Sequence, residues 1–170
     1  MEYYELVRER KSIRDYDPSR PVPREVLERI LDAGRMAPSA VNSQPWRFIV
    51  VESDEMLGKV KKCYTASWFQ DAPQVLIVAG DYNASWVRSD GYNSLETDLA
   101  IAMDHLILAA ANEGVGTCWI GAFDSACLRK TLGLKRSEQV FAITPLGYPR
   151  EGYKAKEKKR KSLSEVAEFI

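Results

Sequence analysis

The sequence predicts an α+β fold in which a sheet lies between two layers of helices. Apolar runs rich in β-branched residues, as in strands, alternate along the chain with segments of helical period. One of these runs, Gln74 to Ala79, is apolar at nearly every position, which is typical of a strand buried on both faces. The 170 residues contain no internal repeat and no linker-like stretch, so we expect a single domain over residues 1–170.

The predicted elements follow in chain order. Helices are expected from Glu2 to Arg10, from Pro23 to Ala37, from Glu55 to Cys63 and from Leu95 to Asn112, with a short helix between Asp124 and Gly133 and a last helix that begins with a capping-box pattern at Ser162. Strands are expected at Arg47 to Val51, Gln74 to Ala79, Val115 to Gly121 and Gln139 to Leu146. The helix of residues 95–112 is apolar around much of its circumference, which predicts a place at the centre of the domain.

Composition and charge indicate an ordinary globular protein of the cytoplasm. Hydrophobic residues make up 45% of the chain and charged residues 28%, and 24 basic residues balance 24 acidic ones. This balance gives no general attraction to nucleic acid or to a membrane surface. No apolar run reaches the roughly 18 residues of a membrane span, and the charged N-terminus is unlike a signal peptide. Cys63, Cys118 and Cys127 have neither metal-site spacing nor an even number, so we expect no metal site and no disulfide framework.

The sequence carries no recognisable catalytic side-chain signature. His105 is the only histidine and lies within a predicted helix, where a structural role is favoured over a metal ligand or a triad member. The glycines of residues 113–121 follow a helix and precede a strand, the reverse of the order in a dinucleotide-binding loop, which excludes a Rossmann fold. If the protein is an enzyme, we expect a cofactor to supply its reactive atom, with no catalytic side chain.

Two basic segments at opposite ends of the chain are candidates for a phosphate site. In the N-terminal basic segment, Arg10 to Arg14, residues Arg10, Ser12 and Arg14 alternate, which turns two guanidinium groups and a hydroxyl to one side if the segment is extended. The C-terminal basic segment, Lys154 to Lys161, holds six cations and one anion. Each segment has an alternative interpretation, a solvated helix end for the first and a solubilising tail for the second.

Two further segments of small residues could admit a flat ligand close to the backbone. The small-residue loop, Pro38 to Gln44, has no helical or strand period and a composition typical of loops that position a ligand. Residues 118–122, of sequence CWIGA, also leave their backbone amides approachable. A plain buried strand that ends at a glycine turn is the alternative interpretation of residues 118–122.

Together these segments resemble the flavin-dependent nitroreductase family. The resemblance runs in order through RKSIRDY at 10–16, APSAVNSQPWRF at 37–48, GVGTCWIGAF at 114–123, LGYP at 146–149 and KKRKSL at 158–163. It implies a nitroreductase-like three-layer fold and an intertwined homodimer with FMN bound at the subunit interface. It also implies that a C-terminal arm, residues 150–170, packs on the partner subunit.

The resemblance further implies FMN-binding residues by position. The residues that would hold the phosphate are Arg10, Lys11, Ser12, Arg14, Lys158 and Arg160. The partner would lay its small-residue loop against the flavin ring, with contacts from Pro38, Ser39, Ala40 and Asn42 and with Gln44 as an anchor of the loop. The residues beside the reactive N5 edge of the flavin would be Trp119, Ile120 and Gly121. The implied reaction is ping-pong. NADH or NADPH reduces FMN by hydride transfer, and a nitroaromatic, quinone or related small acceptor then takes the electrons.

The chain departs from longer family members between Cys63 and Pro73. This segment lacks the Asn and Lys that contact the flavin pyrimidine in those relatives, and Tyr64, Trp68 and Gln70 are the candidates to replace them. The departure motivates a second hypothesis, a flavin-binding protein without turnover that acts in storage or regulation. Related folds also catalyse reductive dehalogenation. A nucleic-acid binder is disfavoured by the zero net charge and by the lack of aromatic residues interleaved in the C-terminal basic segment.

Overall fold

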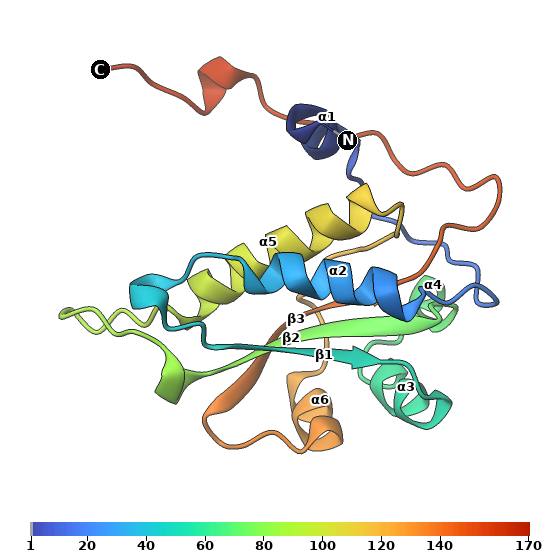
Figure 1. Ribbon diagram of the computed structural model, residues 1–170, viewed down its shortest axis with the longest axis horizontal. Helices are drawn as coiled ribbons and strands as arrows, with labels where there is room; N and C mark the ends of the chain where they lie inside the picture. The colour runs from blue at the N-terminus through green and yellow to red at the C-terminus, as the bar shows by residue number, and fades with distance from the viewer. Residues whose placement is uncertain (1) are drawn as a thin grey trace.

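Three antiparallel strands form the sheet of the protein, whose computed structural model describes residues 2–170 (Figure 1). The strands lie in the order β1 (Trp46–Val51), β2 (Gln74–Asp81) and β3 (Glu138–Leu146). In this register, Ile77 of β2 lies between Ile49 of β1 and Ile143 of β3. The corresponding three strand predictions are confirmed to within one or two residues at each end.

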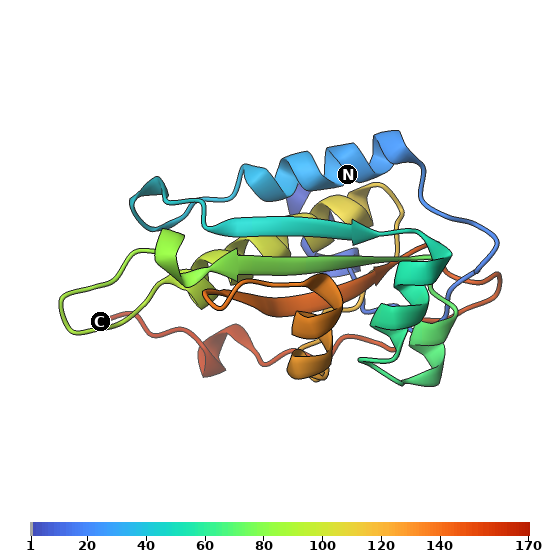
Figure 2. The ribbon, with the colours of Figure 1, turned by 90° about the horizontal axis from the view of Figure 1, so that it is seen from below.

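Helices cover both faces of the sheet, and Figure 1 and Figure 2 show the three layers. One face carries α2 (Arg24–Arg35) and α5 (Leu95–Asn112), and the other carries α3 (Asp54–Lys61), α4 (Ser67–Gln70) and α6 (Ser125–Leu132). The outermost helix, α1 (Tyr3–Glu9), packs on α5, and single 3-10 turns occur at η1 (Ala40–Asn42), η2 (Tyr82–Ala84) and η3 (Leu163–Glu165). The predicted helix, sheet and helix sandwich is confirmed, and α5 is the helix that contacts all three strands as well as α1 and α2. Among residues 2–170, no helix is both long enough and apolar enough to cross a bilayer.

The strand β2 divides the core into two clusters because its side chains alternate between the two faces. Leu76 and Val78 pack with side chains of α2 and α5, whereas Val75 and Ile77 pack with side chains of α3, α4 and α6. Every residue of β2 is buried except the last, Asp81. The prediction of a strand buried on both faces is therefore confirmed.

The ends of α6 follow the capping pattern of the sequence. Asp124 Oδ1 accepts the N–H of Cys127 at 2.9 Å, and Gly133 closes the helix with a left-handed φ of 60°. A residue with a Cβ atom is disfavoured in that conformation, which is why glycine stands there. The predicted short helix between Asp124 and Gly133 is confirmed.

The predicted strand at residues 115–121 is wrong. These residues form only isolated bridges, between Gly116 and Gly147, between Thr117 and Ser12, and between Ile120 and Ile143. Ile143 lies in β3 and Gly147 directly after it, and the two share one antiparallel register with Ile120 and Gly116, whereas Ser12 belongs to the N-terminal basic segment. Pro145, between the two bridges to this end of β3, has no N–H to donate, so the pairing is interrupted and no continuous strand forms.

The predicted last helix is also wrong, since only the 3-10 turn η3 forms there. Its capping box is present, with the Ser162 N–H donating to Glu165 Oε2 at 2.8 Å. Residues 161–170 are all exposed, however, so the apolar face of the expected helix packs on nothing in the chain. A short helix without such packing is unstable in water.

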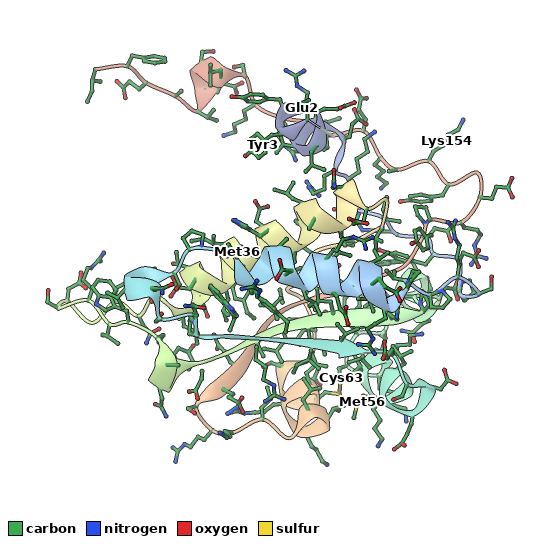
Figure 3. All side chains as sticks on the ribbon, viewed as in Figure 1. Glu2, Tyr3, Met36, Met56, Cys63 and Lys154 are labelled. Atoms are coloured by element: carbon green, nitrogen blue, oxygen red, sulfur yellow. A yellow bond between two sulfur atoms is a disulfide. The ribbon has the colours of Figure 1, made fainter. Side chains whose placement is uncertain are left out.

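The expectation that the cysteines form no disulfide is a third error. Cys63, just after α3, is bonded to Cys127 of α6, and Cys118 is a buried free thiol. Because α3 and α6 pack against each other, they bring together two cysteines that lie 64 positions apart. Figure 3 labels Cys63 on this face of the sheet, near Met56 of α3. An odd number of cysteines excludes complete pairing but not a single pair.

Gly34 marks a close approach of α2 to α5. A Cβ atom there would lie 2.5 Å from Leu106 Cδ2 and 2.7 Å from Leu106 Cγ, whereas a Cβ atom at Gly58 of α3 would meet nothing within 4 Å. We expect Gly34→Ala to lower the free energy of unfolding by about 1–3 kcal/mol through overpacking. The matched control Gly58→Ala should raise it by about 0.4–1 kcal/mol, because alanine favours the helix. Chemical denaturation measures both, and a stabilised Gly34→Ala variant would contradict the close packing.

Candidate functional site

The N-terminal basic segment runs beside the chain that follows α5. Ser12 forms a parallel bridge with Thr117, which places the segment next to Cys118. Burial raises the pKa of the Cys118 thiol, and Arg14, Ser12 and Arg10 each oppose that rise. These three alternate residues therefore all lie near this thiol.

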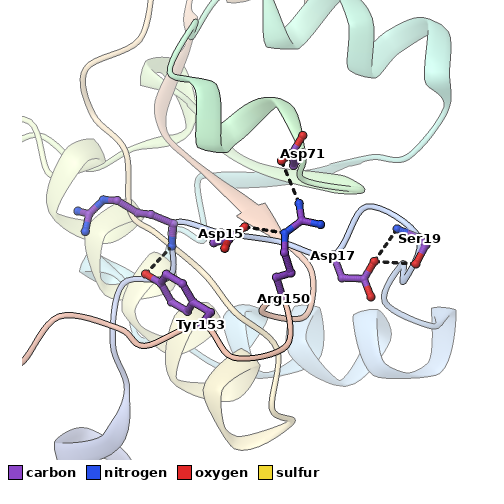
Figure 4. Close-up of polar contacts among 7 residues, drawn as sticks. Asp15, Asp17, Ser19, Asp71, Arg150 and Tyr153 are labelled. Carbon is purple, nitrogen blue, oxygen red and sulfur yellow. Dashed lines mark hydrogen bonds and ion pairs between the residues drawn. The ribbon is translucent and has the colours of Figure 1, made fainter.

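An ion-pair network connects the N-terminal basic segment to the chain that follows β3 (Figure 4). Arg150 donates from Nε to Asp15 Oδ1 and from Nη2 to Asp71 Oδ2, both at 3.1 Å. The Tyr153 hydroxyl accepts the backbone N–H of Arg14 at 3.1 Å. The turn around Arg150 thus holds the backbone of the segment in place and leaves the Arg14 side chain exposed.

The C-terminal basic segment returns to the start of the chain. Lys158 Nζ donates to the carbonyl oxygens of Val7 and Arg10. Burial lowers the pKa of Lys158, the positive charges of Arg10, Arg160 and Lys11 lower it further, and the carboxylate of Glu9 opposes them. Three cations from the two ends of the sequence are therefore close enough to Lys158 to act on it.

In the described part of the chain, Glu9 is the acid placed against this group of cations, Arg10, Lys11, Lys158 and Arg160. Lys11 lies 3.9 Å from Glu9, and both side chains of this pair are exposed. Exposed ion pairs of this kind contribute little to the stability of a protein. A phosphate group would relieve the repulsion and would accept charge-assisted hydrogen bonds from the same side chains. The four residues present therefore fit a phosphate.

Trp119 to Gly121 continue from the bridge beside the N-terminal basic segment. Ile120 is a core residue whose N–H donates to the Ile143 carbonyl at 2.9 Å. Within residues 2–170, the amides of Trp119 and Gly121 donate to no protein group. The Trp119 ring contacts Phe141 edge to face, with the ring centroids 5.8 Å apart, and remains 38% exposed. Two of the three predicted residues thus keep a backbone donor that a ligand can use, and Ile120 does not.

The small-residue loop has an unusual backbone conformation. Val41, Asn42 and Gln44 have φ values of 47°, 58° and 47°. This left-handed region is unfavourable for residues with a Cβ atom, most of all for a β-branched one such as Val41. The N–H of Gln44 donates to Ser39 Oγ at 2.9 Å and closes the loop on itself. Backbone strain of this kind is concentrated at functional sites.

One chain does not bring this loop to the basic segments. Figure 1 and Figure 2 show the loop, between α2 and β1, at one end of the sheet and residues 10–20 toward the other end. Pro38 and Asn42 are exposed, and Ser39 and Ala40 are partly exposed. The structure thus groups the basic residues with Trp119 to Gly121 and leaves the loop apart.

Trp68 is the candidate from residues 63–73 that lies beside the N-terminal basic segment. The Arg14 guanidinium carbon is 5.8 Å from the centroid of the Trp68 ring. Gln70 Nε2 donates to the Tyr64 carbonyl at 3.0 Å, so this amide closes its own turn. Tyr64 contacts Trp68 edge to face. The geometry favours Trp68 over Tyr64 and Gln70 as a wall of the site.

Three residues that contact the small-residue loop or the chain at Arg14 and Asp15 are missing from the candidates predicted from the sequence. They are Asp98, Arg150 and Tyr153. Their partners lie 58, 135 and 139 positions away along the chain. No local pattern marks such contacts. The clustering of Asp15 and Asp17 with the basic residues of RKSIRDYD is the one signal that an arginine elsewhere could pair with this segment.

Comparison with known proteins identifies the class to which this fold and site belong. A model described as the nitroreductase family matches residues 7–63 and 55–148. The matches span most of the chain, which therefore belongs to the nitroreductase family of oxidoreductases, as its motifs predicted.

Individual relatives agree with this assignment. A solved nitroreductase family protein from Clostridium difficile 630 matches with a TM-score of 0.90 and 32% identity over 99% of this chain and 98% of its own. A Methanothermobacter thermautotrophicus protein with the provisional name NADH dehydrogenase/NAD(P)H nitroreductase is 34% identical over an alignment of 161 positions, which covers 89% of this chain and 79% of its own. Iodotyrosine deiodinase 1 of Rattus norvegicus is 26% identical over an alignment of 195 positions, which covers 97% of this chain and 68% of its own.

Strain in the small-residue loop can be measured by substitution. We expect Val41→Gly to raise the free energy of unfolding by about 1 kcal/mol, because glycine adopts a positive φ without steric cost. Val87 is the control: it is also an exposed valine in a loop, but its φ is not positive. Val87→Gly should lower the free energy of unfolding by about 0.5–1 kcal/mol. Thermal denaturation compares the two variants, and equal destabilisation would show that the loop is not strained.

Proposed function

We propose that the protein is an FMN-dependent oxidoreductase that uses NAD(P)H to reduce nitroaromatic, quinone or related small acceptors in the cytoplasm. The observation that carries this proposal is the convergence of Arg10, Lys11, Lys158 and Arg160, which come from the two ends of the chain and outnumber the one acid placed against them, Glu9. FMN has a terminal phosphate that fits this cluster. The nitroreductase motifs imply FMN at the same positions.

The proposed contribution of this chain is to bind and orient the cofactor. The four cations hold the phosphate, with Ser12 beside them, and Arg14 lies against the Trp68 ring. The amides of Trp119 and Gly121 are donors that favour an electron-rich edge of the ring system without a titrating side chain. Bound FMN supplies hydride acceptance and donation. The donor and the acceptor therefore use the site in turn, which gives ping-pong kinetics.

The proposal includes a homodimer, because one chain leaves the site incomplete. Pro38, Ser39, Ala40 and Asn42 lie away from the basic segments and would complete the site of a second copy. The loop exposes Val41 by 74%, and the C-terminal arm, residues 150–170, exposes Phe169 by 94%. The arm also exposes Leu163, Val166 and Ile170, and a concentration of exposed apolar side chains in one segment is typical of protein interfaces. The arm packs on the partner subunit in this arrangement.

The acceptor has a second candidate class, halogenated aromatic compounds. The similarity to iodotyrosine deiodinase 1 along nearly the whole chain favours it. Both classes need the same reduced cofactor and differ in what the acceptor site admits. Flavin storage or regulation without turnover remains the alternative that involves no acceptor.

Cofactor content and turnover test the proposal directly. The purified protein, or the protein after addition of FMN, should be yellow and should bleach anaerobically with NADH or NADPH. Steady consumption of NAD(P)H with a nitroaromatic or quinone, above the rate with free FMN, should follow, and a halogenated phenol tests the second class. Absorbance at about 340 nm follows the consumption of NAD(P)H, and absorbance at about 450 nm follows the reduction of the oxidised flavin.

Three results would contradict parts of this proposal. A colourless protein that takes up no FMN would overturn the cofactor assignment. FMN binding without turnover on any acceptor would favour storage or regulation. Sedimentation of an FMN-loaded monomer would contradict a site shared between two chains.

Single arginine variants test the phosphate and ring contacts. We expect Arg14→Ala and Arg160→Ala each to weaken FMN binding by about 1.5–3 kcal/mol, the range for hydrogen bonds to charged groups. Lys59→Ala is the control, since Lys59 is paired with Glu55 on the exposed surface of α3. Fluorescence titration of FMN gives the dissociation constants. Unchanged affinity in both arginine variants would mean that the basic segments are solvated surface only.

A further inference from the structure

Asp98 is a buried carboxyl group that contacts the small-residue loop. It lies in the first turns of α5 and is only 2% exposed. Its Oδ1 accepts the backbone N–H of Ala40 at 2.9 Å, and its Oδ2 accepts the Ser94 hydroxyl at 2.8 Å. Within residues 2–170, no cation is paired with this carboxyl. The positive end of the α5 dipole favours a carboxylate in this position.

The hydrogen bond from the Ala40 N–H to Asp98 lies at the point where the loop changes its backbone conformation. Ser39 is extended, with φ −141° and ψ 158°, and the left-handed residues Val41 and Asn42 follow directly after Ala40. A left-handed valine persists only where surrounding contacts determine the backbone. The buried carboxyl is a rigid contact of this kind, because it belongs to the central helix of the sandwich.

We propose that Asp98 is a positioning residue for the FMN site: it holds Ala40 so that Ser39 to Asn42 keep the conformation that contacts the cofactor of the partner subunit. This inference rests on the proposed function. It adds a residue that touches no cofactor and acts through the loop. The central helix then links the core of one subunit to the binding site of the other.

Three variants separate positioning from simple stability. Asp98→Ala removes both acceptors, whereas Asp98→Asn keeps an oxygen that can accept the Ala40 N–H. Glu96→Ala is the control, because Glu96 is an exposed acid in the first turn of the same helix with no contact to the loop. If Asp98→Ala does not fold, Asp98→Ser replaces it, since a serine keeps a polar group near Ser94 but is too short to reach Ala40.

Two readouts are measured on each variant. Hydrogen–deuterium exchange of the ligand-free protein reports the order of the loop, and FMN titration reports the dissociation constant. We expect Asp98→Ala or Asp98→Ser to exchange at least about tenfold faster in peptides that cover residues 39–44, and to bind FMN at least about tenfold more weakly, which corresponds to the loss of one hydrogen bond to a charged group. For Asp98→Asn and Glu96→Ala, the exchange rate of these peptides and the dissociation constant of FMN should stay within about threefold of the wild-type values, a change well below the loss of one such hydrogen bond.

The outcomes distinguish this inference from the proposed function. Wild-type protein that binds no FMN would overturn the proposed function and, with it, this inference. Wild-type protein that binds FMN while Asp98→Ala keeps wild-type exchange and affinity, even with a lower melting temperature, would overturn only the inference. Faster loop exchange and weaker binding in Asp98→Ala, with rescue in Asp98→Asn, would support it.

Discussion

The central strand β2 is covered on both faces and paired on both edges, and this constraint determines where the other elements lie. Buried backbone groups must be paired, and β1 and β3 supply these partners on either side. Its apolar side chains alternate, so each face needs an apolar layer, which α2 and α5 provide on one side and α3, α4 and α6 on the other. Gln74, the one polar residue at its buried end, exchanges two hydrogen bonds with the backbone of Val22 and so ties the start of the strand to the chain before α2.

The charged part of the candidate site lies outside this sandwich. Its residues come from the segments before α2 and after β3. Hydrogen bonds from Lys158 to the carbonyls of Val7 and Arg10 join these segments, and so does the ion pair of Arg150 with Asp15, while Arg150 also pairs with Asp71. Without these contacts, repulsion would separate the cations, because like charges in proximity oppose one another. An arrangement that is electrostatically unfavourable without a ligand is typical of a binding site.

Local patterns in the sequence predicted most of the fold. The capped helix that ends at Gly133 and the strand with Ile77 at its centre follow from short-range chemistry, and both are present. The failures involve long-range context. The apolar run at 115–121 pairs with the end of β3 only through isolated bridges, because Pro145 interrupts the ladder, and the capping box at Ser162 forms without packing for a helix.

In the candidate site, too, local patterns were predictable from the sequence and long-range contacts were not. Alternation in the N-terminal basic segment predicted that Arg10, Ser12 and Arg14 share one side, and all three act on the pKa of the Cys118 thiol. By contrast, the sequence could not reveal that the Ile120 amide is already bonded to Ile143, because that bond joins distant segments. Contacts of Asp98 and Arg150 escaped prediction for the same reason. Their partners are neighbours in space only after the sheet has formed.

The bond of Lys158 to the carbonyls of Val7 and Arg10 has a consequence for the two ends of the chain. Helix α1 has seven residues, none of them buried, and a helix of that length is marginal in water by itself. Lys158 satisfies carbonyl groups at its C-terminal end, where the helix leaves acceptors without partners. The two termini therefore become ordered together. A chain shortened before Lys158 would lose order at its beginning as well as at its end.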